Sequence, residues 1–315
     1  MDIAGLNILV TGGAGFLGSH IAERLVSLGA RVRILDTFLS GRDQNLLPIQ
    51  GRISLYQGDI VDQGVVDRAM EGVQVVVHCA FPLAAYDRSL DNQFIHGGSV
   101  GLFNILKAAL REKALVVFSS SIAVYGQQQY LPIDENHPVQ PILLYGVTKL
   151  AGEFYCLTMA HTYGLKTVIL RIADIYGPRN GRVSAPIDFL LKGMGNQPMV
   201  IKGDGSQTRT YTYISDLVDA VILAITCPQA QGEIINIAGD DCISISDLAI
   251  LAKQITGSTG KISLEQAVVS DGRKYWIDNR KAKSLLGFAP KVDISSGLRQ
   301  TLAWLKADPD YFSVL

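Results

Sequence analysis

Short apolar runs alternate with amphipathic segments through the first part of the chain. The stretches 15–28, 94–110 and 144–163 predict helices, and the apolar runs between them are short enough for buried strands. Continuous apolar strands alternating with helices are typical of a doubly wound α/β fold, in which helices cover both faces of a parallel sheet. The predicted strands are residues 7–10, 31–35, 53–56, 73–77, 115–118 and 167–170.

The regular alternation weakens after about Pro178, and glycines and prolines crowd residues 177–205. Shorter elements follow, including a strand at 234–237 and a helix at 245–255. We therefore expect residues 1–177 to form a main, Rossmann-type domain and residues 178–315 to form mainly a smaller substrate-binding lobe. We also expect the chain to return to the main sheet at least once after residue 178.

The composition is that of a globular protein, with 48% hydrophobic and 18% charged residues among 315. A formal net charge of -1 gives no general reason to expect nucleic acid or a membrane surface as a partner. No apolar run reaches the roughly 18 residues of a membrane span, and no leader peptide is recognisable. The four cysteines are widely spaced, which predicts thiols in the reducing cytoplasm and no metal site.

A glycine-rich loop joins the first predicted strand to the first predicted helix. Gly12, Gly15 and Gly18 follow a G-x-x-G-x-x-G pattern, which allows a tight turn and the close approach of a pyrophosphate to the backbone. The helix N-terminus, around Phe16 and Leu17, offers free N–H groups and a partial positive charge to that pyrophosphate. Because a strand precedes the loop and a helix follows it, the pattern predicts a dinucleotide site.

An acidic residue ends the second predicted strand at the distance expected for a ribose contact. The carboxylate of Asp36 would accept hydrogen bonds from the adenosine ribose hydroxyls and would repel a 2′-phosphate. We therefore expect NAD rather than NADP as the cofactor. Arg33 and Arg42 lie nearby in the sequence and weaken this preference slightly.

The ends of the later strands supply further candidates for cofactor binding. Asp59 and Ile60 follow the third strand, where they could meet the edge and the face of the adenine. Ala80 follows the fourth strand, where a small residue lets the cofactor approach, and Ser119 lies at the end of the fifth. His78 precedes Ala80, and we interpret it as a packed core histidine rather than as a catalyst.

Three further residues form a candidate catalytic group. Tyr145 and Lys149 are four residues apart at the start of a predicted helix, so they share one face. A nearby ammonium favours the phenolate form of a tyrosine, which is otherwise a poor base at neutral pH. Ser121 closes a serine run at the end of the fifth strand, where it could hydrogen-bond the substrate oxygen that the tyrosine deprotonates.

In these motifs the chain resembles the extended short-chain dehydrogenases/reductases, specifically the NAD-dependent sugar epimerase/dehydratase family. The likeness extends over nearly the whole chain. It is carried by TGGAGFLG at 11–18, SSSIAVYG at 119–126, YGVTK at 145–149, LRIADIYGP at 170–178 and GDGSQTR at 203–209, with later matches at 236–239 and 281–288.

The resemblance implies a role for each of these residues. Tyr145 would be the base, Lys149 would bind the nicotinamide ribose and tune the tyrosine, and Ser121 would orient the substrate. Arg209 would contact the diphosphate of a nucleotide sugar, in a substrate site that also includes Asp174. The resemblance also implies a UDP-sugar as the favoured substrate and a homodimer formed through helices 94–110 and 144–163.

Two departures from the family pattern narrow the reaction. Ile122 and Ala123 occupy the positions where the family's 4,6-dehydratases carry an Asp-Glu pair. The sugar-acid decarboxylases carry a glutamate at the second of these positions. Both reactions are therefore disfavoured, which leaves oxidation and reduction alone.

Other departures concern substrate contacts. Gly98 stands in place of the asparagine of an NVxGT segment, and Asp174 in place of the asparagine of LRxxNxYGP. Asp174 would add negative charge near a diphosphate, so it either points elsewhere or indicates an unusual substrate. Val268 aligns with a late arginine that often binds the second phosphate, and Arg273, five residues on, is a candidate to substitute for that arginine.

We therefore predict C4 epimerisation of a UDP-sugar through a transient 4-keto intermediate, with NAD regenerated in each turnover. One alternative is a nucleotide-sugar 4-ketoreductase, or a dehydrogenase acting on another hydroxyl compound, which would change the oxidation state of its cofactor. Another is a non-catalytic sensor of NAD or of a sugar nucleotide. The intact Ser121, Tyr145 and Lys149 argue against a sensor, because a sensor needs no base.

Overall fold

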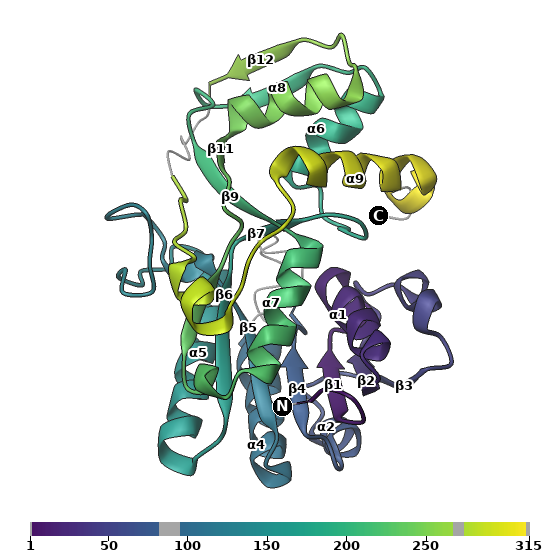
Figure 1. The fold of residues 1–315 in the computed structure, drawn as a ribbon, viewed down its shortest axis with the longest axis vertical. Helices are drawn as coiled ribbons and strands as arrows, with labels where there is room; N and C mark the ends of the chain where they lie inside the picture. Colours follow the sequence, from purple (N-terminus) through teal and green to yellow (C-terminus); the bar gives the residue numbers. More distant parts are fainter. Residues whose placement is uncertain (1, 82–94, 267–273, 313–315) are drawn as a thin grey trace.

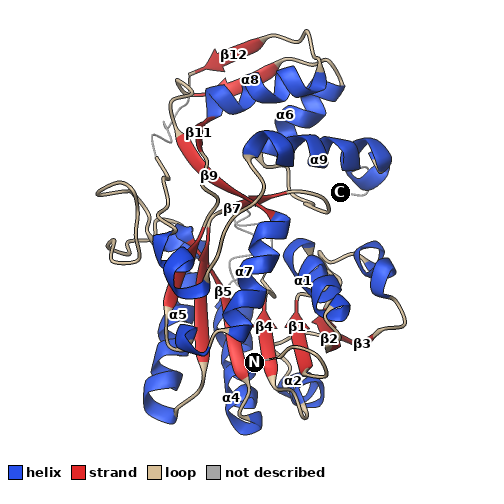
Figure 2. Ribbon diagram, viewed as in Figure 1, coloured by secondary structure: helices blue, strands red, loops and turns tan. Residues whose placement is uncertain are grey.

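The computed structural model describes residues 2–81, 95–266 and 274–312. Its main sheet consists of β1 (Asn7–Thr11), β2 (Arg31–Asp36), β3 (Ile53–Gln57), β4 (Val75–His78), β5 (Leu115–Ser121), β6 (Thr167–Ile172) and β10 (Ile234–Ile237). These seven strands are parallel and lie in the order β10-β6-β5-β4-β1-β2-β3 (Figures 1 and 2). The predicted doubly wound α/β class is confirmed. The strand order reverses between β1 and β4, and such a switch point is where these sheets bind ligands.

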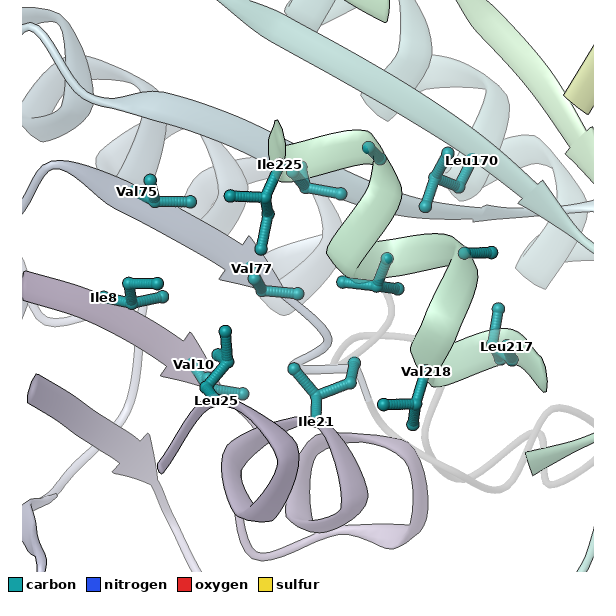
Figure 3. Close-up of a cluster of buried hydrophobic side chains, with 14 of the residues drawn as sticks. Ile8, Val10, Ile21, Leu25, Val75, Val77, Leu170, Leu217, Val218 and Ile225 are labelled. Atoms are coloured by element: carbon teal, nitrogen blue, oxygen red, sulfur yellow. The ribbon is translucent and has the colours of Figure 1, made fainter. Parts of the chain in front are cut away.

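Helices cover both faces of the main sheet because its strands alternate apolar side chains between two cores. Ile8 and Val10 of β1 belong to one core and Leu9 belongs to the other. Figure 3 shows the first core, where Ile21 and Val218 of two different helices approach β1 and β4. The helices of this face are α1 (Phe16–Ser27) and α7 (Ile214–Thr226); those of the other face are α2 (Gln63–Met70), α4 (Leu102–Glu112) and α5 (Leu144–Tyr163).

A second group of elements lies beyond the carboxyl ends of the main strands (Figure 1). It contains a three-stranded sheet, a two-stranded sheet and three helices around a core of their own, which includes Tyr176, Leu190 and Leu248. The strands are β7 (Asp174–Tyr176), β9 (Thr208–Tyr213) and β11 (Cys242–Ser244), then β8 (Met199–Lys202) and β12 (Ile262–Glu265). The helices are α6 (Ala185–Met194), α8 (Ile245–Thr256) and α9 (Ile294–Ala307).

The second half of the chain also contributes to the main sheet. Strand β10 pairs in parallel with β6, and α7 packs beside α1 on one face. Residues 178–315 therefore form one edge of the main sheet and all of the smaller group of elements except β7. Short helical turns complete the described fold: η1 (Asp43–Ile49), η3 (His96–Gly101), η4 (Ile122–Val124), η5 (Pro228–Ala230), η6 (Ala282–Leu286) and η7 (Pro309–Phe312).

The structure departs from the predicted elements at several boundaries. The strand predicted at 73–77 begins at Val75, and β5 and β6 extend further than predicted, to Ser121 and Ile172. The start of the helix predicted at 94–110 lies outside the described residues. Its next part is a π-helical turn, His96–Gly101, because glycines in this stretch favour no regular α-helix. Within the described ranges, no helix is both long enough and apolar enough to cross a membrane.

Candidate active site

A cavity of about 1760 Å³ opens at the carboxyl ends of the main strands, next to the switch point. Residues of the main sheet and of the second group of elements both line it. It therefore has room for a dinucleotide and a second ligand together. Every predicted site residue lines this cavity: Gly12, Gly15, Phe16, Leu17, Gly18, Asp36, Asp59, Ile60, Ala80, Ser119, Ser121, Tyr145, Lys149, Asp174 and Arg209.

The glycine loop forms a cradle that larger residues would fill. Gly12 has a positive φ of 68°, and a Cβ on it would lie 2.8 Å from the backbone of Ala80. A Cβ on Gly18 would collide with the carbonyl oxygen of Gly12. The N-cap of α1 is Gly15, which gives the helix no side-chain cap, so the first N–H groups remain available to an anion. This geometry suits a pyrophosphate.

Asp36 is held in place at the end of β2 by two backbone donors. Its carboxylate accepts hydrogen bonds from the N–H of Ala14 at 2.9 Å and from the N–H of Phe38 at 2.9 Å. Burial raises the pKa of this carboxyl, and the backbone hydrogen bonds oppose that effect. The fixed carboxylate lines the cavity and keeps lone pairs for a ribose diol.

The two arginines near Asp36 in the sequence are engaged elsewhere. Arg33 donates hydrogen bonds to the carbonyl oxygens of Ala69 and Glu71. Arg42 donates to the carbonyl oxygen of Tyr311, and its guanidinium lies 4.1 Å from the centre of the Tyr311 ring. Neither guanidinium binds the Asp36 carboxylate, and Nη2 of Arg42 has no hydrogen-bond partner among the described residues, so the slight weakening of the preference for NAD stays a prediction.

His78 is a packed core residue, as predicted. Its Nδ1 lies 2.8 Å from the hydroxyl of Thr11, and its ring stacks on Phe118. Burial lowers the pKa of His78 to about 3, so the ring is neutral at physiological pH. The carbonyl oxygen of His78 accepts a hydrogen bond from the hydroxyl of Ser119, which ties the ends of β4 and β5 together.

Ser121, Tyr145 and Lys149 meet where the end of β5 faces the first turns of α5. Lys149 is 4% exposed and donates a hydrogen bond of 2.8 Å to the carbonyl oxygen of Ser119. Burial lowers the pKa of Lys149 to about 8. Burial raises the pKa of the Tyr145 phenol, whereas its hydrogen bond with Ser121 lowers it. The sequence predicted a depressed tyrosine pKa, and in this geometry the net direction is upward, because burial outweighs the hydrogen bond with Ser121 and the charge of Arg182.

Asp174 and Arg209 lie on strands β7 and β9, which pair side by side. Arg209 Nε is 3.7 Å from a carboxylate oxygen of Asp174, so the arginine predicted to bind a diphosphate has an acidic neighbour. Arg209 is mostly buried, with 14% of its side chain exposed, whereas Asp174 is 50% exposed. Asp174 therefore points to the cavity beside Arg209 and does not turn away. Val268 and Arg273 lie outside the described residues.

The structure adds cavity residues that sequence reasoning missed. Arg182 lines the cavity, and its charge lowers the pKa of Tyr145. Phe81 also lines it and packs edge to face on Tyr145, with ring centres 5.1 Å apart. Both residues lie on irregular segments after a strand, where no periodic pattern indicates which way a side chain points. The one feature of the sequence that could have indicated Phe81 as a cavity residue is its position directly after Ala80, at the end of a strand.

A dinucleotide cradle joined to a Ser-Tyr-Lys group in one cavity defines an extended short-chain dehydrogenase/reductase. Over residues 8–238, the chain matches the model of the NAD dependent epimerase/dehydratase family. This match spans more than half of the chain, so the chain belongs to that family.

Relatives within the family act on nucleotide sugars in different ways. A protein of Methanocaldococcus jannaschii, provisionally named a UDP-glucose 4-epimerase, is 34% identical over 95% of this chain and 98% of its own length. A UDP-N-acetyl-alpha-D-glucosaminuronate decarboxylase of Bacillus cytotoxicus is also 34% identical, over 95% of this chain and 97% of its own. The structure of a UDP-glucuronic acid 4-epimerase of Bacillus cereus, solved with UDP-glucuronic acid and NAD, has a TM-score of 0.88 and 28% identity, covering 96% of this chain and 99% of its own.

Proposed function

We propose that this protein is an NAD-dependent nucleotide-sugar epimerase that inverts C4 of a UDP-sugar through a transient 4-keto sugar. The observation that carries the proposal is the single cavity, which joins Ser121, Tyr145 and Lys149 to a dinucleotide cradle on one side and to Arg209 on the other. A base beside both ligands is what reversible oxidation of a bound sugar requires. The epimerases among the similar proteins support the same reading.

The first half of the cavity fits NAD. The pyrophosphate would lie on the glycine cradle and on the N-terminus of α1, around Phe16 and Leu17, with the ribose diol on Asp36. Asp59 and Ile60 would border the adenine, and Ala80 and Ser119 the path toward the nicotinamide. When bound, NAD⁺ supplies a reversible acceptor for the hydride that leaves C4 of the sugar.

The residues of this chain handle the proton. Tyr145 removes it from the sugar O4 and returns it after the keto sugar has turned, while Ser121 hydrogen-bonds the same oxygen. To lower the pKa of a tyrosine from about 10 to near 7 requires on the order of 4 kcal/mol of extra stabilisation for the phenolate. Ser121 and Arg182 already act in that direction, and the Lys149 ammonium and a bound nicotinium ring would add to them.

The second half of the cavity holds the nucleotide diphosphate. The guanidinium of Arg209 can bind two phosphate oxygens at once, and it lies at the cavity wall on β9. Asp174 competes for the same guanidinium at 3.7 Å. The substrate diphosphate would have to displace this carboxylate, so Asp174 would lower the affinity for the substrate.

Dehydration and decarboxylation are less well supported by the residues present. Ile122 is 5% exposed and Ala123 carries no acidic group, and both line the cavity directly after Ser121. A dehydratase or decarboxylase of the family's usual pattern has a carboxylate in this segment. The similar decarboxylase of Bacillus cytotoxicus makes this distinction worth testing directly.

We also propose that two copies of the chain associate through α5 and through the neighbouring η3 and α4. Large apolar side chains are exposed on this side of the molecule, and exposed apolar patches of this kind are typical of contacts between proteins. Phe154 is 58% exposed and Phe103 is 45% exposed. Val100 of η3 and Val147 of α5 are exposed as well.

Incubation of the purified protein with NAD⁺ and UDP-linked glucose, N-acetylglucosamine, glucuronate and their C4 epimers tests the proposal. Proton NMR identifies the product, and absorbance at the NADH band follows the cofactor. We expect the C4 epimer of one sugar without net NADH. Stoichiometric NADH would instead establish a dehydrogenase, and loss of carbon dioxide from glucuronate a decarboxylase. A protein that binds these ligands and converts none would either act on a substrate outside this panel or be a sensor.

A further inference from the structure

The Lys149 ammonium is surrounded by aromatic rings. Its Nζ lies 4.3 Å from the centre of the Phe81 ring, 5.2 Å from that of Phe118 and 5.9 Å from that of Tyr145. These three rings, which we call the aromatic enclosure, come from the segment after β4, from β5 and from α5. Distances within about 6 Å of a ring centre are those of cation–π contacts, and Phe81 makes the shortest of the three.

A glycine makes room for the Phe81 ring. A Cβ on Gly98, in the π-helical turn, would collide with Cγ2 of Thr148 and would lie 3.0 Å from Cε2 of Phe81. The absence of a side chain at Gly98 therefore lets the ring lie between this turn and α5. Phe81 meets Tyr145 edge to face, with an angle of 82° between the rings, so it contacts both members of the catalytic pair.

The aromatic enclosure stabilises the buried charge of the Lys149 ammonium. Burial disfavours the charged form of Lys149, and it lowers the pKa of this lysine to about 8. Among residues 2–81, 95–266 and 274–312, no carboxylate forms an ion pair with its ammonium. The carbonyl oxygen of Ser119 accepts its hydrogen bond, and besides Tyr145 the titratable groups that act on it are the Cys79 thiol and the neutral His78 ring. Aromatic faces stabilise a cation through their quadrupole and carry no net charge. They therefore favour the ammonium without cancelling the positive field at Tyr145, as a neighbouring carboxylate would.

We infer that Phe81 is a positioning residue, whose ring holds the Lys149 ammonium charged and directed toward the Tyr145 side of the cavity. This inference rests on the proposed roles of Lys149 and Tyr145. Phe81 touches the lysine rather than the reacting atoms, so its effect passes through the protonation state of Lys149.

Titration of Lys149 in the full-length protein tests this inference without any substrate. Protein labelled with [ε-¹³C]lysine is followed by NMR against pH, and the Lys149 signal is assigned by its absence in Lys149→Met. Phe81→Leu removes the ring face and keeps an apolar side chain, whereas Phe81→Tyr keeps the face. We expect the Lys149 pKa to fall by about one in Phe81→Leu and to stay at the wild-type value in Phe81→Tyr.

An unchanged or higher Lys149 pKa in Phe81→Leu would overturn the inference, since a ring that only fills space, or whose loss admits water, would not lower it. If Phe81→Leu does not fold, Phe81→Met replaces it in the same comparison. Equal falls in the leucine and tyrosine variants would also contradict a role for the ring face.

The pH profile of turnover gives a second readout once a substrate is known. Loss of the ammonium at high pH removes its support for the phenolate, so the alkaline limb of the Phe81→Leu profile should move to lower pH by the same amount as the titration. A shifted titration in a protein that converts no sugar would leave the inference standing and remove the proposed function. An unshifted titration in an active epimerase would do the reverse.

Discussion

A buried ion pair directly behind the catalytic residues provides a quantitative test of the structure. Both carboxylate oxygens of Glu153 on α5 accept hydrogen bonds from the guanidinium of Arg171 on β6, at 2.9 and 2.7 Å. Glu153 also accepts one from the hydroxyl of Ser120 at 2.5 Å, next to Ser121. Glu153 lies one helical turn beyond Lys149, so the pair fixes the helix that carries the catalytic residues against the end of β5.

The size of the effect follows from burial. The side chains of Arg171 and Glu153 are 5% and 2% exposed, so removing one leaves the other as a buried charge. Arg171→Met or Glu153→Leu alone should lower the free energy of unfolding by about 3–5 kcal/mol. In the double variant no charge of the pair remains, and the main loss is the partner of the Ser120 hydroxyl, about 1–3 kcal/mol. The Tyr125 hydroxyl, which Arg171 also binds, keeps its hydrogen bond to Asn236. The double variant should therefore be more stable than either single variant.

Urea unfolding followed by circular dichroism measures this comparison. The changes in transition midpoint, with a common slope, give the differences in free energy. Arg111→Met is a matched control, because its ion pair with Asp67 is exposed, and its removal should cost at most about 1 kcal/mol. Additive losses in the double variant, or losses below about 1 kcal/mol in both single variants, would refute the reasoning.

Three further predictions concern the cofactor, pH and the substrate. Asp36→Ala should weaken NAD binding and reduce the preference for NAD over NADP, because the variant has no carboxylate to accept hydrogen bonds from the ribose diol or to repel a 2′-phosphate. Calorimetry with both cofactors measures the two affinities. Unchanged affinities would show that Asp36 is not part of the ribose site. The folded-state pKa of His78 is lowered to about 3, so the unfolded chain binds an extra proton below about pH 6.5, and stability should fall by about 2 kcal/mol from pH 8 to pH 5 on account of this residue. His78→Asn should lack that part of the pH dependence in urea unfolding, and an identical profile would contradict a neutral His78. Arg209→Ala should weaken UDP binding by about 10-fold or more. Asp174→Asn should strengthen UDP binding, because loss of the carboxylate leaves the Arg209 guanidinium available to phosphate. Calorimetry with UDP measures both effects, and weaker binding by Asp174→Asn would show that the carboxylate helps to hold the ligand.

Local patterns were sufficient to predict much of the fold and of the site. The glycine spacing around Gly15 and the four-residue step from Tyr145 to Lys149 are set by the backbone geometry of one turn or one helix. Parallel strands then bring their carboxyl ends together, which places Asp36 in the same cavity without any knowledge of tertiary contacts.

Features that depend on tertiary packing could not be obtained in this way. The strand 234–237 is apparent from its apolar residues, yet only the structure places it beside β6 in the main sheet. Gly98 is unexplained in the sequence, and the structure accounts for it through the Phe81 ring and Thr148 that fill its space. The contact between Asp174 and Arg209 arises from the pairing of β7 with β9, which are far apart in sequence.

The most direct test of the account uses a UDP-sugar labelled with deuterium at C4, chosen as the sugar that the protein converts. If the hydride leaves C4 and returns to the opposite face of the same carbon, the epimer should keep its deuterium at C4 in ordinary water, and no reduced cofactor should accumulate. Tyr145→Phe should form this product at least about 100-fold more slowly. Loss of the deuterium to solvent, or near-wild-type turnover by Tyr145→Phe, would contradict the proposed epimerase.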